Sequence, residues 1–472
     1  MMLEAAVSQA EIEAYRAELA GQRVGIIGAG RSGMACTRLL AGLEARVVLA
    51  DAKPLDELAA QAEQAEALGA ELIPEFTQLE QLPGIDLLLV SPGVPRDHPA
   101  VIEACARDIE VIGSLELAYR LCAAPIVAVT GTNGKGTCCR LLADMLGRGG
   151  IPALLAGNIG LPLAALVTSA EPAGVAVVEV SSFQLETIVR FHPRVAVILN
   201  VTADHLDRHE SFDEYVAAKS RVFEMQEPED FAVANLDDPT AAELAGASQA
   251  RLLGISLADE NAAGHLEGDR LVVALEGSSE DICSRYDFRL RGDHHVTNVL
   301  AAAVVARLLG VEPEQIGAAV RGYEPPAHHM ELVAEIGGVR FINDSKASNP
   351  SAALADLAAL ERPFMVIMGG KDKGADFLEL GKFLAARARR VILIGEAANG
   401  IAAAMGDTDV AEHADSLEAA VTRASEVAKP GEVVIMAPAC SSFDMFRNLG
   451  HRGEVFRAAV QMLAEAEAGL RE

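Results

Sequence analysis

Positively charged residues are scarce in this chain of 472 residues. Lysine and arginine together number 39 against 68 aspartate and glutamate residues, which gives a formal net charge of −29. A surface this acidic repels nucleic-acid backbones and anionic membranes. We therefore exclude polyanion binding as the overall function and expect small-molecule partners, with no nucleic acid and no membrane. Any phosphate site must be a local one, built from backbone N–H groups and a few cations.

Long apolar runs and paired cysteines are also absent from the sequence. No stretch approaches the roughly 18–20 uncharged apolar residues of a membrane span, and the first residues lack the apolar core of a signal peptide. The seven cysteines are odd in number and show no C-x-x-C spacing, which is typical of reduced thiols in an intracellular enzyme. We expect a cytoplasmic monomer in which all seven cysteines are packing residues, with Cys440 as the one candidate exception.

Apolar residues, by contrast, are plentiful enough for several cores. They make up 51% of the chain, and at about 100–200 residues per domain the length suggests about three domains. Short β-rich runs alternate with Ala- and Leu-rich helical patterns, which is typical of parallel α/β architecture. The pattern forms three blocks, and we expect domains at residues 1–123, 124–322 and 323–472.

Strands are expected where short apolar runs lie between turn residues. A more polar region of the second block, with runs at 271–274 and 286–290, predicts an antiparallel flank. The other expected strands are 24–27, 47–50, 87–90 and 111–112 in the first block, 126–129, 175–180 and 195–199 in the second, and 339–342, 364–368, 391–394 and 433–436 in the third.

A first glycine-rich turn follows the strand expected at 24–27. Gly28, Gly30 and Gly33 have G-x-G-x-x-G spacing, and Asp51 ends the next strand. Such glycines let the backbone approach a diphosphate at a helix N-terminus, and the acid can accept a sugar hydroxyl. The alternative is a tight strand-to-helix turn that binds nothing.

A second glycine-rich turn, at 130–137, predicts an ATP site. Lys135 among converging N–H groups would neutralise β- and γ-phosphate charge, and a nearby hydroxyl can bind Mg²⁺. The turn is shorter than a common P-loop and has Gly136 where that motif has a hydroxyl residue, so Thr132 or Thr137 must supply one. A purely structural turn is the alternative.

Two further polar residues, Glu179 and His205, lie at or after the ends of neighbouring strands. In a parallel sheet these ends share one edge with the phosphate turn, so both side chains can converge on the same Mg²⁺–nucleotide. Each alone would more often be an ordinary polar residue at a strand end. Together with Lys135 they outline an ATPase site.

Lys219 lies on an apolar helix face. Ser211 and Glu214 form a capping box that predicts a helix start, and the apolar spacing that follows includes Lys219 in its stripe. The side chain could snorkel to solvent. A lysine desolvated beside Mg²⁺ could instead lose its proton, take up CO₂ as a carbamate and serve the metal as an anion.

The third block places polar loops after three of its strands. These loops carry Lys346, Lys373 and Ser442, which would suit an anionic small substrate. Solvated loops are the alternative for each of them.

Taken together, these motifs resemble those of the Mur ligases. The resemblance covers nearly all of residues 20–465 and implies a Rossmann-like N-terminal domain for a uridine nucleotide, a central P-loop-type ATPase domain with a parallel sheet, and a Rossmann-like C-terminal domain. It implies an ATP-dependent amide ligase that joins D-glutamate to UDP-N-acetylmuramoyl-L-alanine through an acyl phosphate. The motifs that carry it are Gly131-Thr-Asn-Gly-Lys135, Glu179-Val-Ser-Ser-Phe-Gln-Leu185, Asn200-Val-Thr-Ala-Asp-His-Leu-Asp-Arg208, Ile342-Asn-Asp-Ser-Lys346 and Ser441-Ser-Phe-Asp444.

The resemblance also implies roles for individual residues. The catalytic residues would be Lys135, His205, Lys219 and Lys346, and the ATP-binding residues Gly131, Thr132, Asn133, Gly134, Lys135, Gly136, Thr137, Asn298 and Asp344. Mg²⁺ would be served by Thr137, Glu179, His205 and a carbamylated Lys219. The substrates would contact Gly30, Arg31, Ser32, Asp51, Lys53 and Asn158 on the nucleotide-sugar side and Ser348, Lys373 and Ser442 on the glutamate side.

Four positions depart from the family pattern. Gly136 replaces a hydroxyl residue, His295 stands where an Asn is expected near adenine, His329 replaces an Arg, and Leu449 replaces an aromatic residue. These changes bear on ATP affinity and amino-acid choice more than on the fold.

Two other functions are compatible with the motifs. A folylpolyglutamate-synthase-like ligase shares the Gly136 feature but lacks the domain with the 28–33 turn. A non-catalytic nucleotide-binding regulator would explain the departures as a decayed site. Phosphate release with the expected substrates separates the enzyme from the regulator.

Overall fold

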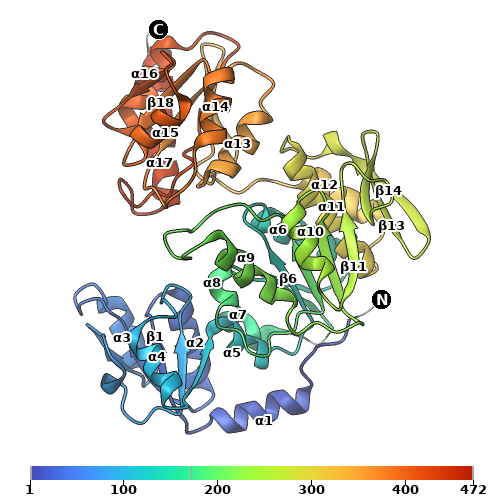
Figure 1. The fold of residues 1–472 in the computed structure, drawn as a ribbon, viewed down its shortest axis with the longest axis vertical. Coiled ribbons are helices and arrows are strands. Elements are labelled where there is room, and N and C mark those ends of the chain that lie inside the picture. Colours follow the sequence, from blue (N-terminus) through green and yellow to red (C-terminus); the bar gives the residue numbers. More distant parts are fainter. Residues whose placement is uncertain (1–2, 172, 470–472) are drawn as a thin grey trace. The chain divides into compact units, whose positions relative to one another are not determined.

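The computed structural model describes residues 3–171 and 173–469 and contains three sheets flanked by helices (Figure 1). The chain has the three-domain α/β architecture expected from the sequence, with one sheet in each third of the chain. Contacts group it into two compact units: the first is Met1–Val201, Val216–Ser284 and Thr297–Val320, and the second is Thr202–Tyr215, Arg285–Val296 and Arg321–Glu472. The boundaries after residues 123 and 322 stay a prediction.

The first sheet is five-stranded and parallel. Its order, β3-β2-β1-β4-β5, places β1 at the centre, and the apolar runs of the central strands are buried because helices cover a parallel sheet. Its strands are β1 (Arg23–Ile27), β2 (Arg46–Ala50), β3 (Glu71–Ile73), β4 (Leu87–Val90) and β5 (Glu110–Gly113), and its helices are α1 (Gln9–Leu19), α2 (Arg31–Gly42), α3 (Ala59–Ala67), α4 (Pro99–Ala106) and α5 (Ser114–Arg120).

The second sheet has nine strands in the order β14-β13-β12-β11-β10-β9-β6-β8-β7. The strands from β7 to β12 pair in parallel, and β12, β13 and β14 pair antiparallel. The strands are β6 (Ile126–Thr130), β7 (Ala153–Gly157), β8 (Val175–Glu179), β9 (Val195–Ile198), β10 (Phe231–Asn235), β11 (Arg251–Ile255), β12 (Gly264–Glu267), β13 (Arg270–Leu275) and β14 (Ser278–Ser284). The α-helices are α6 (Lys135–Arg148), α7 (Leu163–Leu166), α8 (Ser182–Leu185), α9 (Phe212–Ser220), α10 (Pro239–Gly246), α11 (Asp293–Leu308) and α12 (Pro313–Gly322).

The antiparallel flank corrects one expected strand. Residues 286–290 form no strand: a short 3-10 helix covers Arg285–Asp287, and Tyr286 is exposed. The polar strand β14 pairs with β13 instead, across a turn whose central residues, Glu276 and Gly277, both have positive φ. Two positive φ angles characterise the hairpin turn that matches the natural strand twist.

The third sheet has the order β15-β16-β20-β17-β18-β19 and is parallel except for the edge strand β15. Apolar cores lie on both of its faces. Its strands are β15 (Glu331–Ile336), β16 (Val339–Asn343), β17 (Phe364–Gly369), β18 (Arg390–Ile394), β19 (Ala411–His413) and β20 (Val433–Met436), and its helices are α13 (Pro350–Ala358), α14 (Leu378–Arg387), α15 (Ala398–Met405), α16 (Leu417–Val427) and α17 (Leu449–Gly469).

The remaining expected strands are confirmed to within one residue at each end. The predicted helix start at Ser211 is also confirmed, because the Ser211 hydroxyl accepts the N–H of Glu214 at 3.2 Å and α9 begins at Phe212. The second half of the capping box differs: the Glu214 carboxylate accepts the N–H of Glu210 at 2.8 Å.

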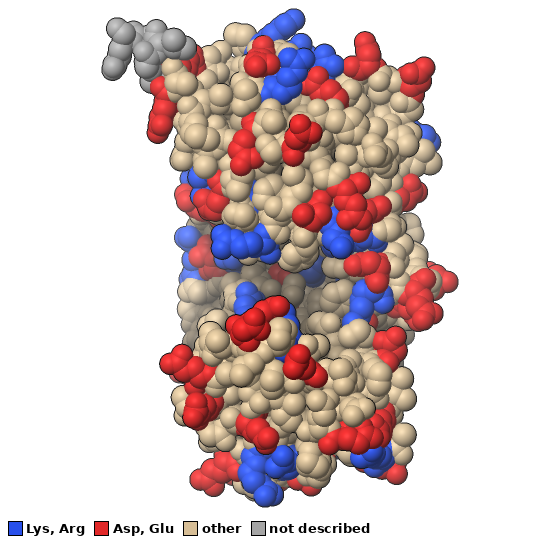
Figure 2. Space-filling model, turned by 90° about the vertical axis from the view of Figure 1, so that its left-hand side faces the viewer, with Lys and Arg blue, Asp and Glu red and all other residues tan. Residues whose placement is uncertain are grey.

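The expected burial of the cysteines is confirmed for all but one of them. Six cysteines are buried, but Cys105 is exposed, so its expected packing role is wrong. Within the described residues no helix combines the length and apolar character needed to cross a membrane. On the face drawn in Figure 2, acidic side chains are scattered among basic ones.

The buried pair Glu116–Arg120 on α5 predicts a large effect on stability. Glu116 is fully buried and accepts hydrogen bonds from the N–H groups of Val189 and Arg190 and from Arg120 Nε at 2.9 Å. Glu116→Ala leaves the buried Arg120 guanidinium with Glu110 as its remaining carboxylate partner and leaves two backbone N–H groups without their acceptor, so it should lower the free energy of unfolding by about 3 kcal/mol. Urea titration followed by far-UV circular dichroism measures the change.

The matched control is Glu103→Ala on α4, which removes a pair with the same i,i+4 spacing. Arg107 is half exposed there, so the expected loss is below about 1 kcal/mol. Equal losses for both variants would contradict the assigned role of the buried pair.

Candidate active site

The first glycine-rich turn brings the start of α2 close to strand β1. Gly28 has φ 97°, and a Cβ at Gly33 would lie 1.9 Å from the carbonyl oxygen of Gly28. Only glycine fits at this approach. No side chain caps the N-terminus of α2, so its first N–H groups face the space beyond the turn.

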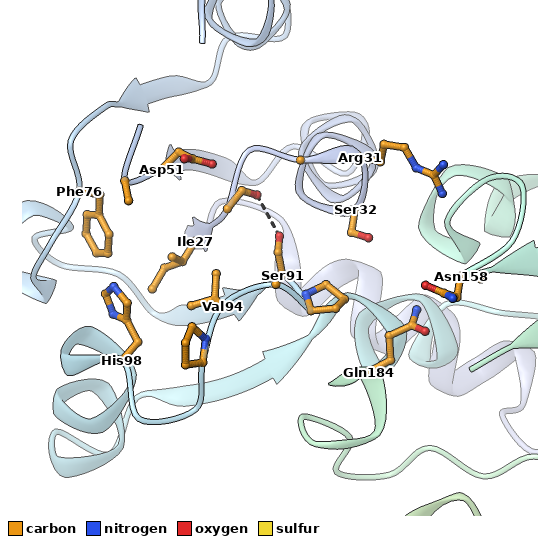
Figure 3. Close-up of a pocket in the computed structure, with 17 residues that line it drawn as sticks. Ile27, Arg31, Ser32, Asp51, Phe76, Ser91, Val94, His98, Asn158 and Gln184 are labelled. Carbon is orange, nitrogen blue, oxygen red and sulfur yellow. Dashed lines mark hydrogen bonds between the residues drawn. The ribbon is translucent and has the colours of Figure 1, made fainter. Parts of the chain in front are cut away.

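A cavity of about 540 Å³ opens at this turn (Figure 3). Four of the expected substrate residues line it: Gly30, Arg31, Ser32 and Asp51. Asp51 Oδ2 accepts the N–H of Ala29 at 2.7 Å, which holds the turn. Asn158 also lines the cavity, but Lys53 does not and pairs with Glu57 on the surface.

Residues that sequence reasoning missed form one end of this cavity. The rings of Phe76 and His98 stack with centroids 5.8 Å apart and planes 7° apart. Figure 3 shows this pair at one end and Asn158 with Gln184 at the other. Ser91, which directly follows β4, donates its hydroxyl to the Gly28 carbonyl at 2.9 Å. The aromatic end suits a planar base, and the polar end suits a sugar or peptide.

The second glycine-rich turn leads into α6, which begins at Lys135. Gly134 has φ 83°, and no side chain caps the helix. Asn200 holds the turn from the next strand: its side-chain oxygen accepts the N–H groups of Thr132 at 3.1 Å and Asn133 at 2.8 Å. The N-terminal amides of an uncapped helix form an anion site.

Two lysine side chains meet at the carbonyl oxygen of Gly131. Lys135 Nζ donates to it at 2.9 Å and also to the Thr132 carbonyl at 2.7 Å. Lys219 Nζ donates to it at 2.8 Å, and Lys219 is only 1% exposed. The predicted position of Lys219 on a buried helix face is confirmed, which excludes snorkelling to solvent.

Acidic and polar groups border the same turn. Glu179 is buried at the end of β8, and its Oε1 accepts a hydrogen bond from Asn158 at 2.9 Å. A Cβ at Gly136 would lie 3.2 Å from Glu179 Oε2, and one at Gly134 would lie 2.1 Å from the side chain of Asn298. A buried carboxylate beside a phosphate-binding helix end has the oxygen donors that Mg²⁺ prefers, and the buried Thr137 offers a hydroxyl.

The second unit contains a small polar cavity. Ser348 and Lys373 line it together with Asp204, Asn349 and Lys371. Lys373 Nζ lies 3.6 Å from Asp204 Oδ1, and Asn349 Nδ2 donates to Asp204 Oδ2 at 3.0 Å. Sequence reasoning missed Asn349 and Lys371.

Two of the expected residues are not part of this cavity. Ser442 is buried but does not line it. His205 belongs to the same unit, with φ 58°, and its part in a magnesium site stays a prediction.

The charge of Asp204 is stabilised by its neighbours. Burial raises the pKa of this carboxyl, but the charges of His205 and Lys373 and the hydrogen bond from Asn349 outweigh burial and lower the pKa overall. The cavity therefore holds the Asp204 carboxylate beside the Lys373 ammonium, so it presents both kinds of charge that an amino acid carries.

Asp344 and Lys346 follow β16 in the second unit. Asp344 is fully buried, and burial together with the neighbouring Asp356 raises its pKa well above the usual value. Its Oδ1 accepts the N–H of Met330 at 3.1 Å. Burial therefore favours the protonated form of this carboxyl, which can donate a hydrogen bond as well as accept one.

Comparison with known proteins gives three family matches in chain order. They are the Mur ligase MurD-like N-terminal domain over residues 22–113, the Mur ligase middle domain over 129–306 and the Mur ligase glutamate ligase domain over 328–440. Together they cover most of the chain and all three sheets.

Individual relatives agree with these matches. The chain is 42% identical over 451 residues to the UDP-N-acetylmuramoylalanine–D-glutamate ligase of Pelotomaculum thermopropionicum, covering 94% of this chain and 98% of that protein. It is 40% identical to the ligase of the same name from Geotalea daltonii, covering 95% and 99%.

Solved structures show the same fold. A pseudomurein peptide ligase type C from Methanothermus fervidus has a TM-score of 0.60 at 18% identity, with 94% of this chain and 100% of that chain covered. A MurF ligase from Thermotoga maritima in complex with ADP also has a TM-score of 0.60, at 16% identity, covering 91% and 99%. With the family models in order and relatives about 40% identical over nearly their whole length, this chain belongs to the Mur ligase family.

Proposed function

We propose that this chain is an ATP-dependent ligase that adds D-glutamate to UDP-N-acetylmuramoyl-L-alanine in cytoplasmic peptidoglycan precursor synthesis, working as a monomer. The observation that carries the proposal is the continuity of the site in the first unit. The cavity at the first glycine-rich turn reaches Asn158, which is bonded to Glu179 beside the turn that holds Lys135 and Lys219.

The uridine-linked substrate is proposed to lie along this cavity. Its base would stack at the Phe76–His98 end, and its diphosphate would face the uncapped start of α2 with Arg31 and Ser32. Its sugar-peptide end would then reach Asn158 and Gln184. This direction delivers the terminal alanine carboxylate toward the phosphate turn.

ATP is proposed to place its phosphates at the N-terminus of α6. The free helix amides and Lys135 would stabilise the negative charge of the transferring phosphoryl group. Residues 131–137 would surround the phosphates, with Asn298 packed against Gly134. In the second unit, Asp344 and Lys346 are proposed as nucleotide-binding residues.

The residues present fit a magnesium ion. Glu179 and Thr137 supply oxygen donors, and a carbamate on Lys219 would add an anionic one at a buried position. Bound Mg²⁺ would neutralise phosphate charge and polarise the γ-phosphoryl group. His205 is assigned to metal or phosphate contact.

The reaction then has two steps. An oxygen of the alanine carboxylate attacks the γ-phosphorus, the bond to the β,γ-bridging oxygen breaks, and ADP leaves an acyl phosphate. The amine of D-glutamate attacks the carbonyl carbon, loses a proton, and expels phosphate to give the amide. Ser348 and Lys373 of the small polar cavity in the second unit are proposed to hold the glutamate carboxylates. Ser442 is proposed for the same role, because it lies two residues after Cys440, which lines that cavity.

Lys135→Ala tests the phosphate site. Phosphate release should occur with ATP, Mg²⁺, UDP-N-acetylmuramoyl-L-alanine and D-glutamate all present. The variant should lose at least about 100-fold in kcat, because a preorganised charge at the transferring phosphoryl group is removed. Lys382→Ala, on the exposed surface of α14, is the control. A folded wild type with no turnover on any amino acid of a panel would support the regulator instead.

Variants of Lys219 distinguish a carbamate at this position from a simple ammonium group. Lys219→Ala should abolish measurable phosphate release, and acetate or propionate should restore part of it by replacing the carbamate oxygens. Lys219→Arg keeps a positive charge but cannot hold CO₂ in this way, so the same carboxylates should not restore its activity. Full activity of Lys219→Arg would contradict the carbamate assignment.

Arg31 tests the direction of substrate binding. Arg31→Ala should raise KM for the uridine-linked substrate roughly 10- to 100-fold, since a charge-assisted contact to a diphosphate is worth roughly 1.5–3 kcal/mol when well ordered. KM for ATP should not change. Arg38→Ala on the same helix is the matched control, because Arg38 contacts Gln64 and not the cavity.

A further inference from the structure

A cluster of buried histidines and aspartates lies in the second unit, outside the cavities used above. It draws on the first turn of α11, the loop before β15, the end of β16, and α13. Its members are His294, His295, His329, Asp344 and Asp356. Two of them, His295 and His329, are positions where the chain departs from the family pattern, and the ligase reaction as proposed uses neither.

The donor atoms of three members converge. Nε2 of His294 lies 3.1 Å from Asp356 Oδ1, and Nε2 of His295 lies 3.3 Å from the same oxygen. The two imidazole rings have centroids 3.9 Å apart. One ligand atom from each residue can be chosen so that all three lie within 4.8 Å of one another.

Several polar atoms in the cluster lack a hydrogen bond. His295 is 3% exposed, and among the described residues neither of its ring nitrogens makes a hydrogen bond. Nδ1 of the buried His329 also lacks a hydrogen-bond partner among these residues. A buried polar atom without a partner is destabilising, so this concentration of such atoms needs an explanation.

The distances match a tetrahedral ion. With metal–ligand bonds of about 2.0–2.2 Å, neighbouring ligand atoms of a tetrahedron are about 3.3–3.6 Å apart. The two nitrogen–oxygen distances of 3.1 and 3.3 Å need only small adjustments to reach this range. Zn²⁺ accepts this donor set of two imidazoles and one carboxylate, with water as a fourth ligand.

We propose that His294, His295 and Asp356 bind one Zn²⁺ ion that joins α13 to the first turn of α11. Asp344 is left to the nucleotide, and His329, whose ring is 5.4 Å from that of His295, packs beside the ion. Gly292 makes the arrangement feasible, because it has φ 112° and a Cβ there would lie 2.8 Å from the ring of His294. The site does not depend on the ligase reaction.

Zinc binding to the full chain tests the proposal without substrates. Chelator-stripped protein is titrated with Zn²⁺ against a chromogenic chelator in excess Mg²⁺, with no nucleotide present. We expect one Zn²⁺ per chain. His295→Asn and Asp356→Asn should each weaken this binding by at least about 100-fold, because removing a direct ligand exceeds the roughly 10- to 100-fold effect of an outer partner.

His413→Ala and Cys105→Ala are the controls, because both residues are exposed and lie outside the cluster. Both should bind zinc as the wild type does. X-ray absorption of zinc-loaded wild type should show scattering from two imidazole rings, a readout that needs no variant to fold. Equal zinc affinity in wild type and His295→Asn, or a spectrum with no imidazole, would overturn the proposal.

Discussion

The carbonyl oxygen of Gly131 accepts hydrogen bonds from two lysine ammonium groups, and the phosphate site depends on this one atom. The two charges repel each other, yet both are held within hydrogen-bond distance of the same oxygen. Gly131 has φ 143°, a conformation that a residue with a side chain rarely adopts. In a chain with a net charge of −29, this turn concentrates positive charge where the helix dipole of α6 adds to it. An arriving phosphate would relieve the repulsion, and so would the proposed carbamate on Lys219, which carries no positive charge.

The candidate site follows from how parallel strands end. Ser91, Asp51 and the first glycine-rich turn lie beyond the carboxyl ends of β4, β2 and β1, and the phosphate turn and Asn200 lie beyond β6 and β9. Ligands of open α/β sheets bind outside these ends because the helix N-termini and loops collect there. The candidate binding and catalytic residues therefore lie at one edge of each sheet, beyond the carboxyl ends of the strands. The residues within the strands pack in the core.

The strands predicted correctly from the sequence are those whose local residue pattern is compatible with only one kind of secondary structure. The run at β4 is apolar at every position because both faces are buried, so it was recognised to the residue. The apolar pattern wrongly predicted a strand at 286–290, where Tyr286 is exposed. It also missed β14, because many residues of this edge strand are polar. Tertiary pairing, absent from local sequence, decided both cases.

The candidate site was predicted in the same uneven way. The glycine-rich turns and Lys219 could be recognised because their structure depends on residues close to them in the sequence, and the spacing of those residues is visible there. The stacked pair Phe76–His98 joins two loops that nothing in the sequence connects. Nothing near Asp356 in the sequence indicates burial. The fold shows that this residue is 5% exposed and lies among histidines. Contacts between distant segments are what sequence patterns leave out.

The Asn349 side chain makes hydrogen bonds both at the start of α13 and in the small polar cavity. Its Oδ1 accepts the N–H of Ala352 at 2.8 Å and so begins α13, while its Nδ2 bonds to Asp204 in the small polar cavity. The helix start and the cavity wall therefore share one amide group. Any substitution there changes both at once, and a kinetic defect in an Asn349 variant could be attributed to either. Only a double-mutant cycle with Asp204 would apportion the loss between helix and cavity.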